Sequence, residues 1–176
     1  MKEEIEQMEI IFKPEWFQSA YYVYVLTIEH NDKQTYYYVG QTGDRNHKSA
    51  RSPFYRLMGH YNTYNFTKGT DAQLVKGLFN NNLIKQPEDK SKRVCVEEAI
   101  KSGAIKITAK YFKIADFGEL EHKSCVKMVE EIELKLIQLM KKKYELFNKQ
   151  SDEIKEITNK ENIERAETIF NLLRVV

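Results

Sequence analysis

The sequence predicts an α+β domain: a small central antiparallel β-sheet of three strands, flanked by helices, with an extra helix at the C-terminal end. Two tyrosine-rich segments with the period of a strand, Tyr22–Leu26 and Tyr36–Gly40, lie near the start of the chain. A third segment with alternating apolar residues covers residues 105–114. Apolar residues recur with the period of a helix over residues 126–147 and 154–173. Strands and helices in separate runs are typical of this fold class.

The other elements follow from local patterns. In chain order we expect a helix over residues 3–12 that stops near Pro14, strands over 21–28 and 35–39, helices from Ser52-Pro53 and over 71–81, a solvated loop over 86–93, a short helix over 96–101, a strand over 105–114, and helices over 126–147 and 154–173. Asn31 and Asp32 supply turn residues between the first two strands, which makes that pair a hairpin.

The hairpin holds six of the eleven tyrosines of the chain. With a period of two, four of them are expected on one face of the sheet: Tyr22, Tyr24, Tyr36 and Tyr38. A buried phenol needs a hydrogen-bond partner, and phenylalanine would pack as well without that requirement. The pattern suits a functional cluster, but tyrosine is also a good strand former, so a purely structural role stays open.

The helix that begins at Pro53 carries two patterns. Ser52 is a typical N-cap and Pro53 a typical first residue. Apolar side chains at i, i+3, i+4 and i+7 predict its core face: Phe54, Leu57, Met58 and Tyr61. Arg56 and His60 lie off that stripe, four residues apart, and share another face of the helix.

Length and composition indicate one globular domain with short additions at its ends. The 176 residues are 41% apolar and 31% charged, and we expect an N-terminal extension over 1–19, a domain over 20–149, and an amphipathic helix within 150–176 that packs on the domain. The sequence has no run of 18 apolar residues, so it predicts no membrane-spanning helix. Its acidic start differs from a signal peptide. Because Cys95 and Cys125 have no CxxC spacing, we expect reduced thiols and a cytoplasmic location. Since no membrane-spanning helix is predicted, we expect no membrane partner.

Charge is unevenly spread along the chain, although the net charge is only +2. Residues 1–32 carry two basic and seven acidic side chains, whereas residues 33–86 carry eight basic and two acidic ones. The basic central third favours a local phosphate-binding surface, but lysine-rich loops are also common in proteins without one.

Glu133 interrupts the apolar face of the long helix predicted over 126–147. It lies four residues after Val129 and three before Leu136, which places its carboxylate on or beside the buried stripe. An ionised carboxylate near a core costs several kcal/mol unless it is paired or binds a cation. Two interpretations follow: a structural salt bridge to an arginine or lysine, or a ligand of a divalent metal such as Mg²⁺.

Five elements then occur in a recognisable order. They are Tyr22-Val23-Tyr24, Tyr38-Val39-Gly40 followed by Gln41-Thr42, Arg56 with His60 on one helix, Glu133 before Leu136-Ile137, and Asn148. Together, over about residues 20–149, they resemble the GIY-YIG nuclease superfamily. Tyr22 stands where that family usually has glycine.

The arginine of the resemblance has alternatives. The stretch from Gly40 to Arg56 is longer than in compact members of the family, so Arg45 or Arg51 could be the matching residue. Arg56 is preferred because it alone has a histidine, His60, four residues later on a helix that begins with proline. The loop with Arg45, Lys48 and Arg51 is then interpreted as an insertion that binds DNA.

The resemblance implies roles for the matching residues. Glu133 would bind one Mg²⁺ or Mn²⁺ ion, and Arg56 would hold the scissile phosphate. Tyr24 would be the general base or relay a proton, which His60 could take, and Tyr38 would position water or phosphate. Gly40 and Asn148 would support the site structurally.

The function implied is a metal-dependent endonuclease that hydrolyses phosphodiester bonds in DNA, of the restriction or phage-defence type. Cutting both strands would require a homodimer or successive nicks by a monomer. Two other hypotheses remain: a catalytically inactive DNA-binding module of the same fold, and an interaction domain whose last helix, from Ile154 to about Leu173, keeps its apolar stripe exposed for a partner.

Overall fold

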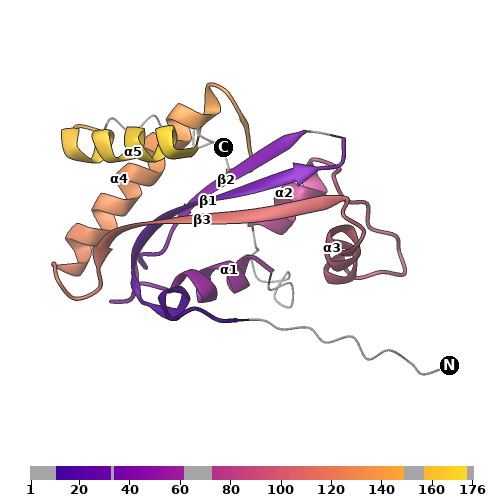
Figure 1. Cartoon of the computed structure of the whole chain (residues 1–176), viewed down its shortest axis with the longest axis horizontal. Helices are drawn as coiled ribbons and strands as arrows, with labels where there is room; N and C mark the ends of the chain where they lie inside the picture. The colour runs from indigo at the N-terminus through magenta and orange to yellow at the C-terminus, as the bar shows by residue number, and fades with distance from the viewer. Residues whose placement is uncertain (1–10, 33, 62–72, 149–156, 174–176) are drawn as a thin grey trace.

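The computed structural model describes four stretches of the chain: residues 11–32, 34–61, 73–148 and 157–173. At its centre lies a four-stranded sheet of order β3-β1-β2-β4 (Figure 1). The strands are β1 (Ala20–His30), β2 (Thr35–Gln41), β3 (Ile105–Asp116) and β4 (Glu145–Leu146). β1 pairs with β2 and β3 in antiparallel direction, but β4 runs parallel to β2. The α+β class is confirmed, whereas the prediction of three strands, all antiparallel, is wrong because of the short β4.

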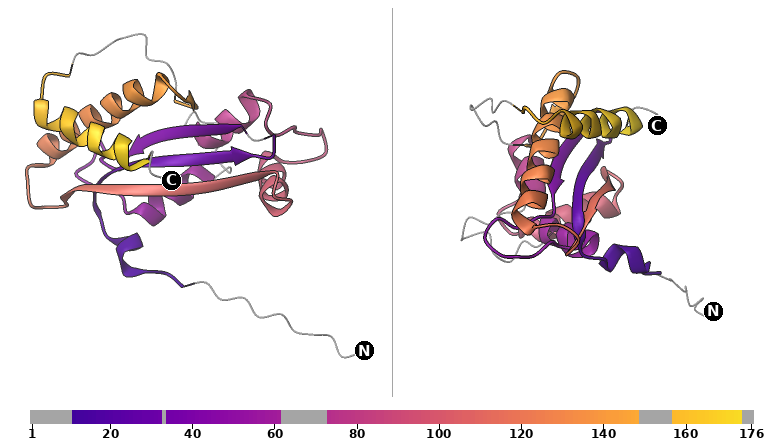
Figure 2. Two further views of the ribbon diagram at one scale, coloured as in Figure 1. Left: turned by 45° about the horizontal axis from the view of Figure 1, so that its top comes forward. Right: turned by 90° about the vertical axis from the view of Figure 1, so that its left-hand side faces the viewer.

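Helices cover both faces of the sheet (Figures 1 and 2). They are the 3-10 helix η1 (Pro14–Phe17) and the α-helices α1 (Pro53–Tyr61), α2 (Gln73–Asn80), α3 (Lys92–Lys101), α4 (His122–Lys141) and α5 (Lys160–Leu173). Side chains of α4 and α5 pack on one face of β1, and those of α1, α2 and α3 pack on the other. Among the described helices, none combines the length and the apolar character needed to cross a membrane.

Strand β1 is the centre of the core, since all residues from Ala20 to Leu26 are buried. The four tyrosines predicted on one face of the hairpin do share it. Tyr24, Tyr36 and Tyr38 belong to the core on the side of α2 and α3, and the ring of Tyr22 contacts Tyr111 of β3 at a centroid distance of 6.1 Å. Adjacent strands therefore present a continuous group of phenols to one layer of helices.

Helix α1 meets the sheet with part of the face that its apolar pattern predicts, since Leu57 and Tyr61 pack against the core but Phe54 and Met58 do not. His60 is its only buried residue, and Met58 is 51% exposed. Phe54 contacts Phe17 of η1 at 4.8 Å between ring centroids instead of joining the core of the sheet. The hydroxyl of Ser52 makes no hydrogen bond within the described residues, so the predicted side-chain cap is wrong. Polar contacts of Arg56 and His60, described below, join these apolar contacts in holding the helix against the sheet.

Helix α4 ends at Lys141 and does not continue to Phe147 as the sequence predicts. The chain turns back there, pairs with β2, and lets Phe147 donate its backbone N–H to Tyr37 O at 2.8 Å. The ring of Phe147 occupies the space that Gly77 of α2 leaves open, because a Cβ on Gly77 would lie 2.3 Å from that ring. A contact far away in the sequence therefore decides where this helix stops.

Other helix boundaries also differ. α3 begins at Lys92, inside the predicted loop, because Ser91 Oγ accepts a hydrogen bond from Val94 N at 3.4 Å. α5 begins at Lys160, later than predicted, and three of its apolar residues, Ala166, Ile169 and Phe170, are buried in the core shared with α4, whereas Leu172 is exposed. The helix expected over 3–12 lies outside the described residues except for the last two, which are not helical.

The side chain of Asn148 closes the sheet beside β2. Its Oδ1 accepts a hydrogen bond from Val39 N at 2.9 Å, and its Nδ2 donates to Val39 O at 2.8 Å. The amide thus replaces one peptide group of a neighbouring strand and continues the pairing that β4 begins. Because Val39 lies between Tyr38 and Gly40, this contact holds the part of β2 that carries both residues.

We predict that Asn148→Asp lowers the free energy of unfolding by about 1–3 kcal/mol, because the carboxylate has no donor for Val39 O. Urea denaturation at pH 7 measures the effect. Asn159→Asp is the matched control, since Asn159 Oδ1 only accepts a hydrogen bond, from Asn162 N at 3.3 Å, and aspartate keeps that function. Equal losses in the two variants would contradict the role assigned to Asn148.

Candidate active site

Three predicted site residues meet at one hydroxyl group. The hydroxyl of Tyr24, in β1, lies 2.7 Å from His60 Nε2 and accepts a hydrogen bond from Arg56 Nε at 2.8 Å. Tyr38, in β2, lies beside them, with its ring centroid 5.1 Å from that of His60. Tyr24, Tyr38 and His60 are buried, whereas Arg56 is partly exposed. The cluster therefore consists of three buried rings behind one guanidinium that reaches solvent.

The hydrogen bonds at Tyr24 define where its proton lies. Its oxygen already accepts from Arg56, so its own proton is available for His60 Nε2. Burial and the nearby Arg56 lower the pKa of His60 to about 3, so the imidazole is neutral at pH 7 and can accept at Nε2. Burial, with a contribution from Tyr38, raises the pKa of Tyr24 well above its usual value, while Arg56 lowers it. In the protein alone Tyr24 stays protonated.

Gly40 makes room for the ring of Tyr24. The two residues are directly opposite each other in the β1–β2 pair. A Cβ on Gly40 would lie 2.3 Å from Cζ and from the hydroxyl oxygen of Tyr24, far inside contact distance. Glycine is required here by the close approach of a side chain, and its conformational freedom is not the reason.

Glu133 approaches this cluster from α4. Electrostatic interactions link its carboxylate to Arg56, Tyr38 and Tyr24. Burial raises the pKa of Glu133 to about 7, even though Arg56 and Arg45 lower it. Its side chain is nevertheless partly accessible.

The carboxylate of Glu133 has no direct partner among the residues that the structure describes. No hydrogen bond or ion pair joins it to any other residue of the described ranges, so the structural salt bridge considered from the sequence is not formed there. No three His, Cys, Asp or Glu side chains gather into a metal site within those ranges either. A single accessible carboxylate fits one Mg²⁺ or Mn²⁺ ligand, with water and phosphate oxygens as the others.

Comparisons of the chain with models of protein families, with curated proteins and with solved structures gave no match. The function of the cluster must therefore be inferred from its own geometry.

The three basic residues predicted to bind DNA lie in the loop after β2, and all three are exposed. Arg45 forms an ion pair with Glu130 of α4, and Arg51 lies 3.7 Å from a carboxylate oxygen of Asp44. Lys48 is at the exposed tip of the loop. Neither Arg45 nor Arg51 contacts the hydroxyl of Tyr24, so Arg56 is the arginine that the structure places in the cluster.

Two residues of the site escaped the sequence interpretation. Tyr111 of β3 stacks on Tyr24, with ring centroids 5.0 Å apart, and its buried hydroxyl makes no hydrogen bond within the described residues. The alternation of β3, once paired with β1, would have indicated it. His122 donates from Nε2 to Asp44 O at 3.0 Å and contacts the hydroxyl of Tyr21 through Nδ1 at 2.7 Å. It anchors the loop after β2, and no sequence pattern announces this contact.

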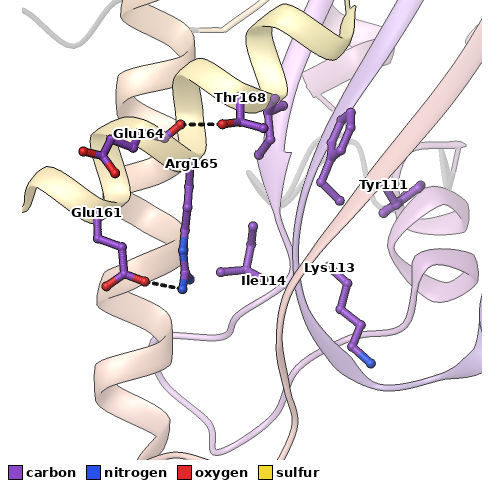
Figure 3. Close-up of a pocket in the computed structure, with 9 residues that line it drawn as sticks. Tyr111, Lys113, Ile114, Glu161, Glu164, Arg165 and Thr168 are labelled. Carbon is purple, nitrogen blue, oxygen red and sulfur yellow. Dashed lines mark hydrogen bonds and ion pairs between the residues drawn. The ribbon is translucent and has the colours of Figure 1, made fainter.

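A groove of about 630 Å³ lies elsewhere, between β3 and α5 (Figure 3). Its charged side chains pair with neighbours along their own elements: Arg165 pairs with Glu161 in α5, and Lys113 pairs with Asp116 in β3. Thr168 donates to Glu164 O at 2.9 Å. Of the residues that surround Tyr24, only Tyr111 lines it. The groove has no convergent group of buried polar side chains, so the cluster at Tyr24 is the stronger candidate for a functional site.

We predict that Gly40→Ala destabilises the protein by about 1–3 kcal/mol, because the added methyl group overlaps the ring of Tyr24. Gly59→Ala in α1 is the control, since a Cβ there meets no atom within 4 Å. This change should raise the free energy of unfolding by at most about 1 kcal/mol. Urea denaturation compares the two. A Gly40→Ala loss that persists undiminished in a Tyr24→Ala background would show that the overlap is not its cause.

We predict that Glu133→Gln stabilises the metal-free protein at high pH. The pKa of Glu133 is about 7 in the folded state and 4.5 as the reference value, so the folded state holds an extra proton between these limits. The stability of the unchanged protein therefore falls as pH rises from about 4.5 to 7. Above pH 7 the variant should be more stable by on the order of 3 kcal/mol, and the difference should vanish near pH 4.

Chemical denaturation in EDTA at several pH values measures this difference. Glu98→Gln, which removes an exposed carboxylate of α3, is the control for loss of one acidic group. A constant difference between Glu133→Gln and the unchanged protein from pH 4 to 8 would argue against the raised pKa.

Proposed function

We propose that this chain is a divalent-metal-dependent endonuclease of the GIY-YIG type that hydrolyses phosphodiester bonds in DNA. The observation that carries the proposal is the Tyr24 hydroxyl, held between Arg56 and His60, within electrostatic reach of the carboxylate of Glu133. Phosphodiester hydrolysis needs a cationic group for the phosphate, an oxygen ligand for a metal ion and a route for a proton. The cluster supplies all three from separate segments of the chain.

Arg56 is suited to bind the scissile phosphate. Its Nε donates to Tyr24, and a further hydrogen bond links the guanidinium to Tyr38, so the group is held in place while its remaining N–H groups can contact phosphate oxygens. The side chain is partly exposed, so a phosphate can reach it. Lysine could not replace it, because one ammonium group lacks this planar arrangement of donors.

Tyr24 and His60 provide the proton route. The Tyr24 hydroxyl is fully buried, so of its two proposed roles, general base and relay, the relay fits the geometry better. A divalent cation at Glu133 would supply positive charge that stabilises the leaving oxygen and lowers the pKa of neighbouring groups. His60 is neutral and aligned to accept the Tyr24 proton, and Tyr38 would position water or phosphate at the edge of the cluster.

DNA would extend from this site over the loop after β2, where Arg45, Lys48 and Arg51 are exposed. An inserted basic loop in a small enzyme of this type suits a restriction or phage-defence endonuclease, which is the role we propose. Two active sites are needed to cut both strands at once, so a homodimer or two successive nicks would complete a double-strand break.

A second candidate is a DNA-binding module of the same fold without catalytic activity. The observation that favours it is the buried hydroxyl of Tyr24, whose pKa is raised well above its usual value. Such a phenol is a poor base unless bound substrate and metal lower its pKa.

The deciding experiment is cleavage of supercoiled plasmid and of single-stranded DNA in Mg²⁺, Mn²⁺ or EDTA. We expect metal-dependent cleavage that falls at least about 100-fold in Glu133→Gln, which removes the charged metal ligand, and in Arg56→Lys, which keeps the charge but loses the planar set of donors for the phosphate. Glu98→Gln and Arg165→Lys make the same chemical changes on α3 and α5 and should keep full activity.

The pattern of products separates the alternatives. Discrete fragments would indicate sequence-specific cutting, and open circles before linear DNA would indicate successive nicks. DNA binding without any cleavage would refute the endonuclease and support the inactive module.

A further inference from the structure

An ion pair lies next to the candidate active site. Arg45 Nε donates to Glu130 Oε1, and the arginine side chain is 72% exposed, whereas that of Glu130 is 28% exposed. Glu130 precedes Glu133 by three residues on α4, so both side chains leave the same side of the helix. Both members of the pair also act on Glu133: Glu130 raises the pKa of that carboxyl group, and Arg45 lowers it.

The backbone that carries Arg45 is firmly held. Asp44 O accepts a hydrogen bond from His122 Nε2 at 3.0 Å, and Asp44 Oδ1 accepts from the backbone of Asn46 and His47 at 2.9 and 3.2 Å. Asp44 N also donates to Ser49 O at 3.1 Å. Arg45 can therefore change its partner by rotation of its long side chain, without rearrangement of the loop.

The charges around Glu133 are balanced in the protein alone. With Glu133 ionised, above pH 7, two carboxylates, Glu130 and Glu133, face two guanidinium groups, Arg45 and Arg56, while the neighbouring Tyr24 and His60 are uncharged. A DNA phosphate that enters this group competes with Glu130 for Arg45. Exposed ion pairs are weak, so a phosphate, whose own contact is also charge-assisted and bidentate, can displace the carboxylate.

We propose that Glu130 holds Arg45 in place of a phosphate, and that the DNA backbone displaces Glu130 when it binds. This inference rests on the proposed function and adds a means of regulation to it. The carboxylate of Glu130, once released, stays one helical turn from Glu133 and adds negative charge where the divalent cation is expected. DNA binding and metal binding then strengthen each other.

A double-mutant cycle tests the exchange. DNA affinity is measured by fluorescence anisotropy in EDTA, at one fixed ionic strength, for the unchanged protein, Glu130→Gln, Arg45→Ala and the double variant. We expect Glu130→Gln to tighten DNA binding about fivefold when Arg45 is present. This factor corresponds to an exposed ion pair at the strong end of the measured range. In the Arg45→Ala background the same change should tighten binding less than about 1.5-fold.

The cycle separates exchange from a general charge effect. Loss of any acidic group favours a polyanion, and Glu98→Gln, which removes the exposed carboxylate of another ion pair on α3, measures that background. An equal gain from Glu130→Gln in both backgrounds would overturn the inference.

A second readout concerns the metal ion. Titration calorimetry gives the Mn²⁺ affinity of an uncleavable phosphorothioate DNA complex and of the protein alone. We expect DNA to raise the Mn²⁺ affinity of the unchanged protein and this increase to be lost in Glu130→Gln; an increase that persists would contradict the inference. If the protein cleaves DNA but the double-mutant cycle is additive, only the exchange is refuted. If the protein binds neither DNA nor metal, the proposed function is refuted as well.

Discussion

The hydroxyl group of Tyr24 is the point on which the arrangement of this molecule depends. A fully buried phenol must find partners, and it finds them in Arg56 and His60, which lie in α1 and not in the sheet. These bonds accompany a rotation of α1 relative to its apolar stripe: Leu57 and Tyr61 still pack against the core, but Met58 is exposed and His60 is buried. The same bonds fix the guanidinium that the proposed function needs, so the stability of the α1 docking and the geometry of the site have one cause.

Room for that hydroxyl comes from β2, and the position of β2 depends on the far end of the chain. Gly40 leaves space for the ring of Tyr24, and Asn148 holds the neighbouring Val39 through both of its amide atoms. A shift of β2 by one residue would place Val39 or Gln41 opposite Tyr24, where a side chain cannot fit. Asn148 therefore acts on the site at a distance, through the register of the β1–β2 pair.

The sequence predicts which helices and strands form better than it predicts where they end and which of their faces are buried. The hairpin, β3 and the buried stripe of α4 follow from periodicity, because neighbouring side chains determine them. The end of α4 and the strand β4 do not, because they depend on Phe147 fitting against Gly77, a contact between residues 70 positions apart. For the site, Tyr24, Arg56 and His60 were predicted together, but Tyr111 and Glu130 were not. Their positions arise from strand pairing and from an ion pair, neither of which leaves a local pattern.

Glu133 shows how a cost in folding can point to a function. A glutamate beside an apolar stripe should acquire a partner. Arg56 is the cation that lowers the pKa of Glu133 most, but its Nε is hydrogen-bonded to Tyr24 instead. The chain thus leaves an accessible carboxylate in surroundings that disfavour its ionised form. A glutamine would fit the same position without that electrostatic cost, so stability gives no reason for the acid. A cation that neutralises the carboxylate would recover the cost only when bound, and the free energy stored in the unpaired group would then contribute to metal affinity.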